Sequence, residues 1–365
     1  MSDAPAKRFE FIDGLRGIAA TMVAIYHLHP NLDPAISAWF SRTLSDLIHW
    51  GLLGVEIFFV ISGFVIAHSV RHGLHTFGYL GRFALRRSIR LDPALWATIA
   101  LEMLAIQAGL MLMPSAVDAP MPEWPQVLAN AVYLQHFLGL GDVVQVFWTL
   151  TYEIQFYIVL VTSLVLWHTL PFLRTVLRGK TWLVPLMALY AYSLLIFIGV
   201  FETPLRGLFI DRWFQFSLGI LVWLRFREVI STQLLAGVIV LTTIVALFGA
   251  PNTFRTMSIM AAVVTGTVLA YAAITDRFSD WLADPVSQFF GRISYSLYLI
   301  HAVIGWRVIS LLKALLGPEL GPGLAFVTFM AGMVTSVISA WVMFKIIEAP
   351  TMSFARRVRL PTRGS

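Results

Sequence analysis

The stretch DGLRGIAATMVAIYH, residues Asp13 to His27, decides the class of fold, because it is a long apolar run with two ionisable side chains inside it. Arg16 and His27 are eleven residues apart. At 3.6 residues per turn, this spacing comes within about 20° of three full turns, so both side chains share one helix face, ~16 Å apart along the axis. Such groups cost about 2.5–3.5 kcal/mol inside a bilayer and usually face a wet cavity. We interpret the stretch as a membrane-spanning helix with a polar face.

Two interpretations of Arg16 and His27 are open at this point. The guanidinium, near the cytoplasmic boundary, offers a fixed fork of donors that suits a phosphate or a carboxylate. The imidazole lies deeper, where its neutral form could accept a proton, and one cavity could contain both groups. In the other interpretation, Arg16 snorkels to the headgroups and His27 is a hydrogen-bonded core residue.

The composition of the whole chain agrees with a membrane protein. The chain has 365 residues, 58% apolar and 13% charged, whereas soluble domains carry roughly 25% charged residues. The same values exclude a disordered chain. The absence of cysteine excludes a disulfide scaffold, a thiolate nucleophile and a thiolate metal site. We expect no metal and no permanently bound cofactor.

Ten apolar runs are long enough to cross a bilayer core, which takes about 20 helical residues. The runs lie near residues 14–29, 51–69, 93–113, 146–168, 182–200, 207–224, 233–249, 255–274, 289–313 and 323–347. We therefore predict an all-α, polytopic membrane protein with about ten transmembrane helices. It forms one integral-membrane domain over residues 1–365, with short cytoplasmic tails at about 1–10 and 351–365. Residues 114–145 are expected to form an irregular outward loop.

Lysine and arginine alternate strongly between the connections. Seventeen lie in one set of segments, and only Arg42, Arg206 and Arg255 lie in the other. By the positive-inside rule the rich set is cytoplasmic, which places the N- and C-termini in the cytoplasm and requires an even number of spans. The formal net charge of +6 is thus mostly a topology signal, and nucleic acid is not an expected partner.

Four arginines, Arg82, Arg86, Arg87 and Arg90, lie in the segment before the third run, which we expect to be an inward loop. If the segment is helical, Arg87 and Arg90 are neighbours on one face, with Arg86 close by. A cluster of this kind can hold a multiply charged phosphate. It can equally be a lipid-headgroup and topology signal.

The second run carries Glu56 near its expected outward end, followed by the small residues Ser62 and Gly63. Glu56 needs a partner or a place among the headgroups, and it is a candidate for substrate binding. Close helix packing explains the small pair at least as well as a substrate role.

The fourth run begins with an unusual density of hydrogen-bonding side chains. Trp148, Tyr152 and Gln155 follow one stripe at i, i+4 and i+7, and Glu153 and Tyr157 are i, i+4 partners. An aromatic belt at the membrane interface would explain the tryptophan and the tyrosines, but it does not explain Glu153.

Two further sets lie near the C-terminus. Tyr298 and His301 are three residues apart, so both can face the bundle interior, although a structural histidine beside a tyrosine is an equal contender. Glu348 lies at the expected inward end of the last run, where we expect Pro350 to stop the helix. Glu348 could pair with the arginine cluster or be a solvated helix end.

Six of these motifs, in this order, resemble acyltransferase family 3, a family of bacterial-type integral-membrane O-acyltransferases. The motifs are Arg16 with His27, GVEIFFVISG at 54–63, RSIR at 87–90, FWTLTYEIQFY at 147–157, ISYSLYLIH at 293–301 and IEAP at 347–350. The resemblance covers nearly the whole chain. It implies a multi-pass protein of the bacterial inner membrane that moves an acyl group, most often acetyl from acetyl-CoA, to a hydroxyl of a glycan or glycosylated molecule.

Carried over to this chain, the resemblance assigns catalysis to Arg16 and His27 and acyl-donor binding to Arg87 and Arg90. Glu348 matches the acidic residue of the C-terminal motif. In the expected mechanism the arginines hold the phosphates of acyl-CoA, and His27 is the general base that deprotonates the acceptor hydroxyl.

The remaining candidates are expected to support these groups. Glu153 or Glu348 is expected to orient the ring of His27, and Arg86 is expected to assist in holding the donor. The candidates for binding the acceptor are Glu56, Trp148, Tyr152, Tyr157, Tyr298 and His301.

Two other classes of protein are open from the sequence. Ten spans with buried charges also suit a secondary transporter or a flippase of a lipid-linked glycan. Many transporters show paired broken helices in internal repeats, which are not evident here. The third class is a membrane sensor that keeps the fold without catalysis. The partners expected for the enzyme are acyl-CoA, a glycan or glycosylated acceptor, and the lipid bilayer.

Overall fold

The computed structural model describes residues 9–29, 48–73, 75–112, 120–317 and 319–361, and the regular secondary structure in this part of the chain is helical. Its elements are α1 (Glu10–Leu28), the 3-10 helix η2 (Trp50–Leu53), α3 (Gly54–Val70), α4 (Phe77–Leu112), α5 (Trp124–Ala131), α6 (Phe147–Thr169), α7 (Pro171–Val176), α8 (Leu183–Ile198), the 3-10 helix η4 (Phe209–Arg212), α9 (Trp213–Phe226), α10 (Thr232–Phe248), α11 (Thr253–Ile274), α12 (Pro285–Ile300), the π-helix η5 (His301–Gly305), α13 (Trp306–Leu316), α14 (Pro322–Met343), the π-helix η6 (Phe344–Glu348) and α15 (Ala349–Ala355). The tails at 1–8 and 362–365, Arg42 and the start of the outward loop at 113–119 lie outside the described residues.

The helices agree with a polytopic membrane protein. Among the described residues, six segments are long and apolar enough to cross a bilayer: Trp50–Val70, Phe77–Met111, Phe147–Thr169, Thr253–Ile274, Pro285–Leu316 and Pro322–Ala355. Two further apolar helices, α8 and α10, are shorter. Each of the ten apolar runs falls on at least one helix. The predicted all-α, multi-pass class is therefore confirmed.

The arginine segment before the third run is helical and not an irregular loop, which is the condition for Arg87 and Arg90 to be neighbours on one face. Residues 77–112 form a single helix, α4, which contains Pro93 in its interior. Arginine, leucine and alanine dominate the segment and favour a helix, and membrane helices tolerate proline because neighbouring groups satisfy the freed backbone atoms. The outward loop is also less irregular than expected, because it contains α5.

The last helix continues past Pro350, contrary to the prediction that this residue stops it. α14 passes through the π-helix η6 into α15, and Pro350 lies in the first turn of α15. A π-turn shifts the hydrogen-bond register just before the proline. A missing N–H is tolerated in a first turn, so the chain remains helical beyond Glu348.

Two helix crossings in the centre of the molecule rely on facing glycines. In the crossing of α1 and α12, a Cβ atom on Gly17 would lie 2.7 Å from the backbone nitrogen of Gly291. In the crossing of α3 and α9, a Cβ atom on Gly219 would lie 2.8 Å from the backbone nitrogen of Phe64. Gly63 meets the backbone of Phe216 in the same crossing. Small residues let backbones approach closely in membranes, so the packing role considered for Gly63 is confirmed.

Helix α3 is also joined to its neighbours by a buried polar network around Glu56, which is 2% exposed. Its carboxylate accepts a hydrogen bond from Arg212 at 3.0 Å and further bonds from Gln215 and Ser258. The guanidinium of Arg212 also lies over the ring of Phe197, at 4.5 Å. The partner that Glu56 needs is therefore Arg212. Together with Gln215 and Ser258, this network ties α3 to η4, α9 and α11.

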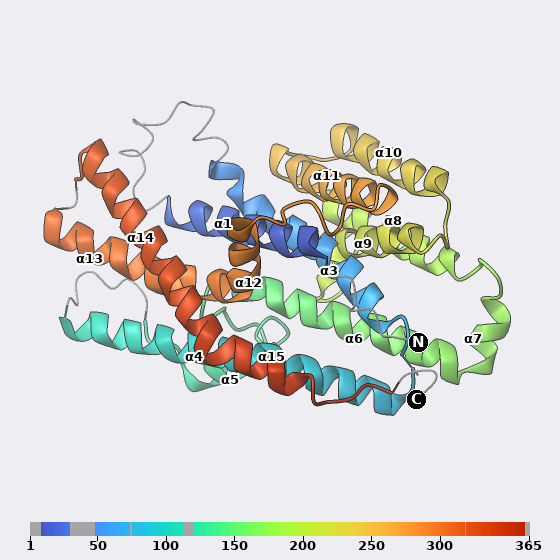
Figure 1. Ribbon diagram of the computed structural model, residues 1–365, viewed down its shortest axis with the longest axis horizontal. Coiled ribbons are helices and arrows are strands. Elements are labelled where there is room, and N and C mark those ends of the chain that lie inside the picture. Colours follow the sequence, from blue (N-terminus) through green and yellow to red (C-terminus); the bar gives the residue numbers. More distant parts are fainter. Residues whose placement is uncertain (1–8, 30–47, 74, 113–119, 318, 362–365) are drawn as a thin grey trace.

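Figure 1 shows how these helices surround α1. Helices α4 and α6 run along one long side of the molecule, and α10 and α11 form a pair on the opposite side. Helices α13 and α14 pack together at one end. Helix α12 lies against α1 in the middle.

Candidate active site

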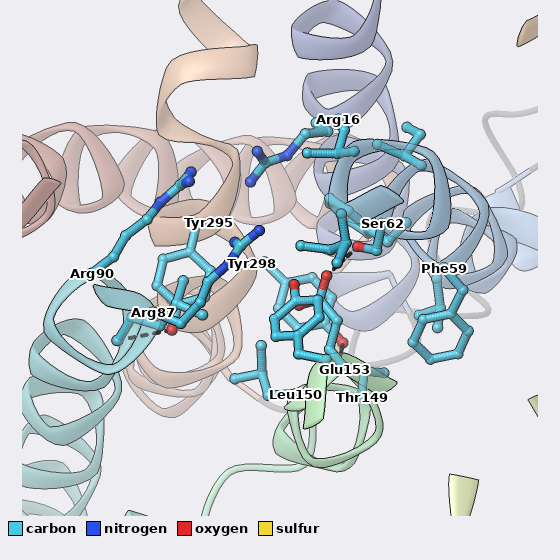
Figure 2. Close-up of a pocket in the computed structure, with 17 residues that line it drawn as sticks. Arg16, Phe59, Ser62, Arg87, Arg90, Thr149, Leu150, Glu153, Tyr295 and Tyr298 are labelled. Carbon is cyan, nitrogen blue, oxygen red and sulfur yellow. Dashed lines mark hydrogen bonds between the residues drawn. The ribbon is translucent and has the colours of Figure 1, made fainter. Parts of the chain in front are cut away.

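A cavity of about 770 Å³ of empty space, partly open to solvent, lies between α1, α3, α4, α6 and α12. Arg16 from α1 and Arg87 and Arg90 from α4 line it, and Figure 2 shows their guanidinium groups pointing toward one another. Glu153 and Tyr157 from α6 also line it.

The three guanidinium groups have little local charge compensation. Among the residues that the structure describes, none of them lies within 4.0 Å of a carboxylate. The Cζ atom of Arg87 lies 4.6 Å from the ring centre of Tyr157. The Nε atom of Arg90 is buried without a hydrogen-bond partner in the described part of the chain. Arg90 also experiences the like charges of Arg87 and Arg16, so the cavity favours a multivalent anion.

The turn of α4 that carries the cavity arginines is held by a hydrogen-bond network on its other side. The carboxylate of Asp92 accepts hydrogen bonds from Ser88 and, at 2.8 Å, from the hydroxyl of Tyr133. Burial, together with the nearby Tyr295 and Asp92, raises the pKa of Tyr133 above its usual range, so this hydroxyl keeps its proton and donates. The Tyr295 hydroxyl in turn donates to the carbonyl of Leu91 at 3.0 Å.

The acidic group of the cavity has a neutral partner. The hydroxyl of Ser62 donates a hydrogen bond to Glu153, which joins α3 to α6 inside the cavity wall. Tyr157, one turn further along α6, is buried and in electrostatic contact with the same carboxylate. The predicted i, i+4 proximity of Glu153 and Tyr157 is therefore present in the structure.

A second cavity, with about 920 Å³ of empty space, shares Arg16 and Arg90 with the first. Arg292 and Arg356 add two exposed guanidinium groups to its lining, and Glu348 adds a buried carboxylate. Glu348 accepts a hydrogen bond from Ser296 at 2.7 Å and is attracted by Arg16 and Arg90. The two cavities therefore meet at a pair of arginines.

Sequence reasoning did not single out Arg292 and Arg356 as site residues. A usable signal existed, because Arg292 directly precedes the ISYSLYLIH motif and Arg356 follows Glu348 by eight residues, about two helical turns. Their place in the second cavity depends on the continuation of the last helix past Pro350, which was not predicted.

His27 lies outside the lining of both cavities in the described part of the chain, contrary to the expectation that one cavity contains it and Arg16. Its ring lies beside that of His301, with 5.2 Å between ring centres, 25° between ring planes and 3.0 Å between Nδ1 of His27 and Nε2 of His301. The physical reason is the ~16 Å that separates Arg16 and His27 along one helix. Tyr298 connects the two places, because it lines the first cavity and its ring centre is 6.1 Å from that of His301.

The group that contacts the ring of His27 differs from the expected one. We expected Glu153 or Glu348 to orient this ring, but these carboxylates accept from Ser62 and Ser296. The ring partner is His301, because α12 crosses α1 closely and brings residue 301 beside residue 27.

The other predicted site residues lie apart from the two cavities. Trp148 packs edge-on against Tyr152 at 5.6 Å and lies 5.7 Å from the guanidinium of Arg212. Arg86, on the same helix as Arg87, lines neither cavity, since it projects from a different side of α4. Glu56 belongs to its own buried network. Among the described residues, no group of three or more His, Asp or Glu side chains is arranged to hold a metal ion.

A multi-pass helical membrane protein with a basic ligand cavity among its helices is the class that the fold and the site define. Comparison with known proteins identifies the family. The model of an acyltransferase domain, acyltransferase family 3, matches residues 9–345, and the chain belongs to this family. The protein is therefore an enzyme, an O-acyltransferase, as the motifs predict. Family membership favours this activity over the transporter, flippase and sensor alternatives.

Two relatives are similar over most of their length, and a third over a part of it. The protein named membrane-bound transacylase BcsY, from Komagataeibacter xylinus, is 25% identical over 375 residues, which cover 99% of this chain and 87% of the relative. Nodulation protein 10 of Rhizobium leguminosarum is 26% identical, with 82% and 83% coverage. The peptidoglycan O-acetyltransferase OatA of Listeria monocytogenes is 29% identical over 157 residues, which cover 40% of this chain and 23% of the relative. No solved structure is significantly similar.

Proposed function

We propose that this enzyme transfers an acyl group, in the first place acetyl, from acyl-CoA to a hydroxyl of a glycan or glycosylated molecule. The observation that carries the proposal is the convergence of Arg16, Arg87 and Arg90 on one cavity without a carboxylate at ion-pair distance among the described residues. Coenzyme A brings several phosphate charges, which balance such a cluster. The relative named for peptidoglycan O-acetylation supports a glycan acceptor.

The two cavities suggest how the donor lies. The nucleotide end of acyl-CoA carries the phosphates, and the guanidinium groups of Arg292 and Arg356 favour the second cavity for that end. Arg16 and Arg90, shared by both cavities, hold the diphosphate where the cavities meet, together with Arg87 at the adjoining end of the first cavity. The uncharged pantetheine arm then lies in the first cavity, whose wall includes Phe58, and extends toward the histidine pair past Tyr298.

The proposed topology agrees with a donor whose nucleotide end faces the cytoplasm and whose acyl end lies deeper in the membrane. Ten spans with both termini in the cytoplasm put the start of α1, the first half of α4 and the start of α12 on the cytoplasmic side, where acyl-CoA is made. Under this topology the enzyme is a multi-pass protein of the bacterial inner membrane. His27 and His301 then lie deeper in the bilayer than the arginines.

In the proposed reaction, His27 is the general base. The acceptor oxygen attacks the carbonyl carbon of the thioester while its proton passes to the imidazole of His27. The carbon–sulfur bond then breaks, and the coenzyme leaves as a thiolate that takes the proton back from His27. The products are the O-acyl ester and free CoA, so the base is regenerated in each turnover. General-base assistance of this kind contributes about 10²- to 10⁴-fold.

The direct test uses the purified full-length protein in lipid nanodiscs with radiolabelled acetyl-CoA. Peptidoglycan fragments, a lipid-linked oligosaccharide and a glycosylated small molecule serve as separate acceptors. We expect release of CoA thiol with label on at least one acceptor, and loss of both in His27→Ala. Turnover at the wild-type rate in His27→Ala would contradict the general-base role. Transbilayer movement of the lipid-linked oligosaccharide without any acetyl transfer would instead support a flippase.

A further inference from the structure

His27, His301 and the carbonyl group of Leu297 form a linear chain of two hydrogen bonds. The Nδ1 atom of His27 lies 3.0 Å from Nε2 of His301. The Nδ1 atom of His301 lies 2.9 Å from the carbonyl oxygen of Leu297, one helical turn earlier on the same helix. His301 is fully buried and His27 is half-buried, so the bond to Leu297 is shielded from water.

This chain determines which nitrogen of each ring carries a proton. A carbonyl oxygen can only accept, so Nδ1 of His301 is the N–H that donates to Leu297. A neutral imidazole has a single N–H, and Nε2 of His301 therefore carries a lone pair and accepts. The donor to this lone pair is Nδ1–H of His27. The ring of His27 also interacts with the backbone of Val23, one turn earlier on α1, so His301 is one of its partners. Neutral His27 then has its lone pair on Nε2, on the side of the ring away from His301.

The same arrangement suits His27 after it has taken up a proton. An imidazolium donates from both nitrogens, so its Nδ1–H keeps the bond to His301 and gains the strength of a charged donor. The ring of His27 therefore needs no tautomer change or rotation between its two protonation states. Preorganisation of this kind lowers the reorganisation required during the reaction.

Two contacts fix the position of the backbone that carries His27 and His301. The indole N–H of Trp306 donates to the carbonyl oxygen of His27 at 2.7 Å, which satisfies a group that the end of α1 would otherwise leave open. The π-helix η5 begins at His301 and leads directly to Trp306. Gly305, inside η5, allows close packing, since a Cβ atom there would lie 2.6 Å from Ser336 Oγ and 2.7 Å from Leu28.

We propose that His301 is a positioning residue, which holds His27 in the tautomer whose Nε2 accepts the proton of the acceptor hydroxyl. This inference rests on the proposed general-base role of His27. It differs from the expectation that a glutamate orients the ring, and it assigns to His301 a role other than acceptor binding. The relay is neutral, which suits its place inside a bundle where an added carboxylate would need its own partner.

The test compares three variants at position 301 with the wild type. His301→Leu removes the hydrogen-bond acceptor, and His301→Gln can place its side-chain oxygen near the position of Nε2. We expect His301→Leu to lower kcat by about 10²-fold or more, because a histidine in the wrong tautomer has little base activity. Its affinity for acetyl-CoA should stay within about threefold of the wild type. His301→Gln should recover most of kcat, and His301→Asn, with a shorter side chain, should recover less.

Nitrogen NMR of the protein labelled at histidine gives a readout that does not depend on turnover. The chain has 9 histidines, and the signals of His27 are assigned by their loss in His27→Gln. We expect the wild type to show a protonated Nδ1 and an unprotonated Nε2 at His27, and His301→Leu to show a mixture of tautomers.

Several results would overturn the proposal. An unprotonated Nδ1 at His27 in the wild type is one such result. A wild-type kcat in His301→Leu is another, and an equal decrease of kcat in His301→Gln and His301→Leu is the third. If His301→Leu does not fold, the proposal is tested by the protonation of His27 in the wild-type spectrum and by kcat of His301→Gln. Absence of acetyl transfer by the wild type, with the expected spectrum, would overturn the proposed function and leave the tautomer assignment standing.

Discussion

At the scale of single residues, the arginines of α4 differ in whether they line the cavity, although they carry the same charge. Arg86 and Arg87 are neighbours in sequence, but only Arg87 lines the first cavity. A helix turns about 100° per residue, so adjacent side chains point to different surroundings. Arg87 stacks on Tyr157, which holds its guanidinium at the cavity wall.

We predict that Arg87→Ala weakens the binding of acetyl-CoA by about 10- to 100-fold, because a hydrogen bond to a charged group contributes about 1.5–3 kcal/mol and each 1.4 kcal/mol is tenfold in affinity. Isothermal titration of the nanodisc protein measures this change. Arg86→Ala, with the same loss of charge on the same helix, is the matched control and should bind within about twofold of the wild type. Equal weakening in the two variants would show that general positive charge, and not the cavity, attracts the donor.

A second residue-scale prediction concerns Glu56. We expect Glu56→Ala to destabilise the protein by about 3 kcal/mol, because Asp211, at 3.4 Å, is then the one carboxylate among the described residues at ion-pair distance from the buried charge of Arg212. Thermal unfolding in detergent measures the loss. The matched control is Arg277→Ala, which breaks the exposed pair with Asp280 and should cost less than about 1 kcal/mol. A Glu56→Ala protein of normal stability with impaired acceptor binding would restore the substrate role first expected for Glu56.

At the scale of helices, the crossing of α1 and α12 determines the geometry of the whole site. Gly17 and Gly291 meet backbone to backbone, and each is adjacent in sequence to an arginine of the second cavity, Arg16 or Arg292. The same pair of helices, followed by η5, brings His27 beside His301. The position of both functional groups therefore depends on one close contact.

We predict that Gly17→Leu costs more than about 3 kcal/mol in stability, at or above the usual range for overpacking, because the atoms it would displace belong to the backbone of the facing helix. The variant should also lose acetyl-CoA binding, since Arg16 moves with the helix. Gly237→Ala, in the exposed middle of α10 where a Cβ atom meets nothing within 4 Å, is the control and should be as stable as the wild type or slightly more so. Normal melting of Gly17→Leu would refute the close crossing.

At the scale of the whole molecule, the orientation in the membrane decides which substrate reaches which end of the site. Helix α8 is among the shorter apolar helices, and it connects a segment rich in basic residues to one that contains Arg206. The proposed ten-span topology requires α8 to cross the membrane. It places Lys180 in the cytoplasm and Glu202 outside.

The chain contains no cysteine, so single cysteines report their side of the membrane without background. We predict that Glu202→Cys reacts with a membrane-impermeant maleimide in intact cells, and that Lys180→Cys reacts only after permeabilisation. Both positions are exposed, so labelling is not limited by burial. Labelling of both cysteines from the outside would mean that α8 does not span, and the even count of spans would have to be revised.

Much of the architecture could be predicted because it follows from local patterns. Apolar runs of membrane length predicted the helices, and the spacing of Glu153 and Tyr157 predicted their proximity on α6. The order of six short motifs was sufficient to identify the family. Local reasoning failed at Pro350, because a π-turn just before it shifts the helix register, and this depends on packing around the last helix.

The amino-acid sequence by itself determined that this protein is a multi-pass helical acyltransferase, since hydrophobic length, helical spacing and motif order are properties of neighbouring residues. Only the tertiary structure decided that Arg212 neutralises Glu56, that Arg292 and Arg356 join Arg16 and Arg90, and that His301 contacts the ring of His27. Each of these pairings joins helices far apart in the chain. Such pairings depend on which helix faces come together when close-packed backbones meet, and no periodicity within a single helix encodes that.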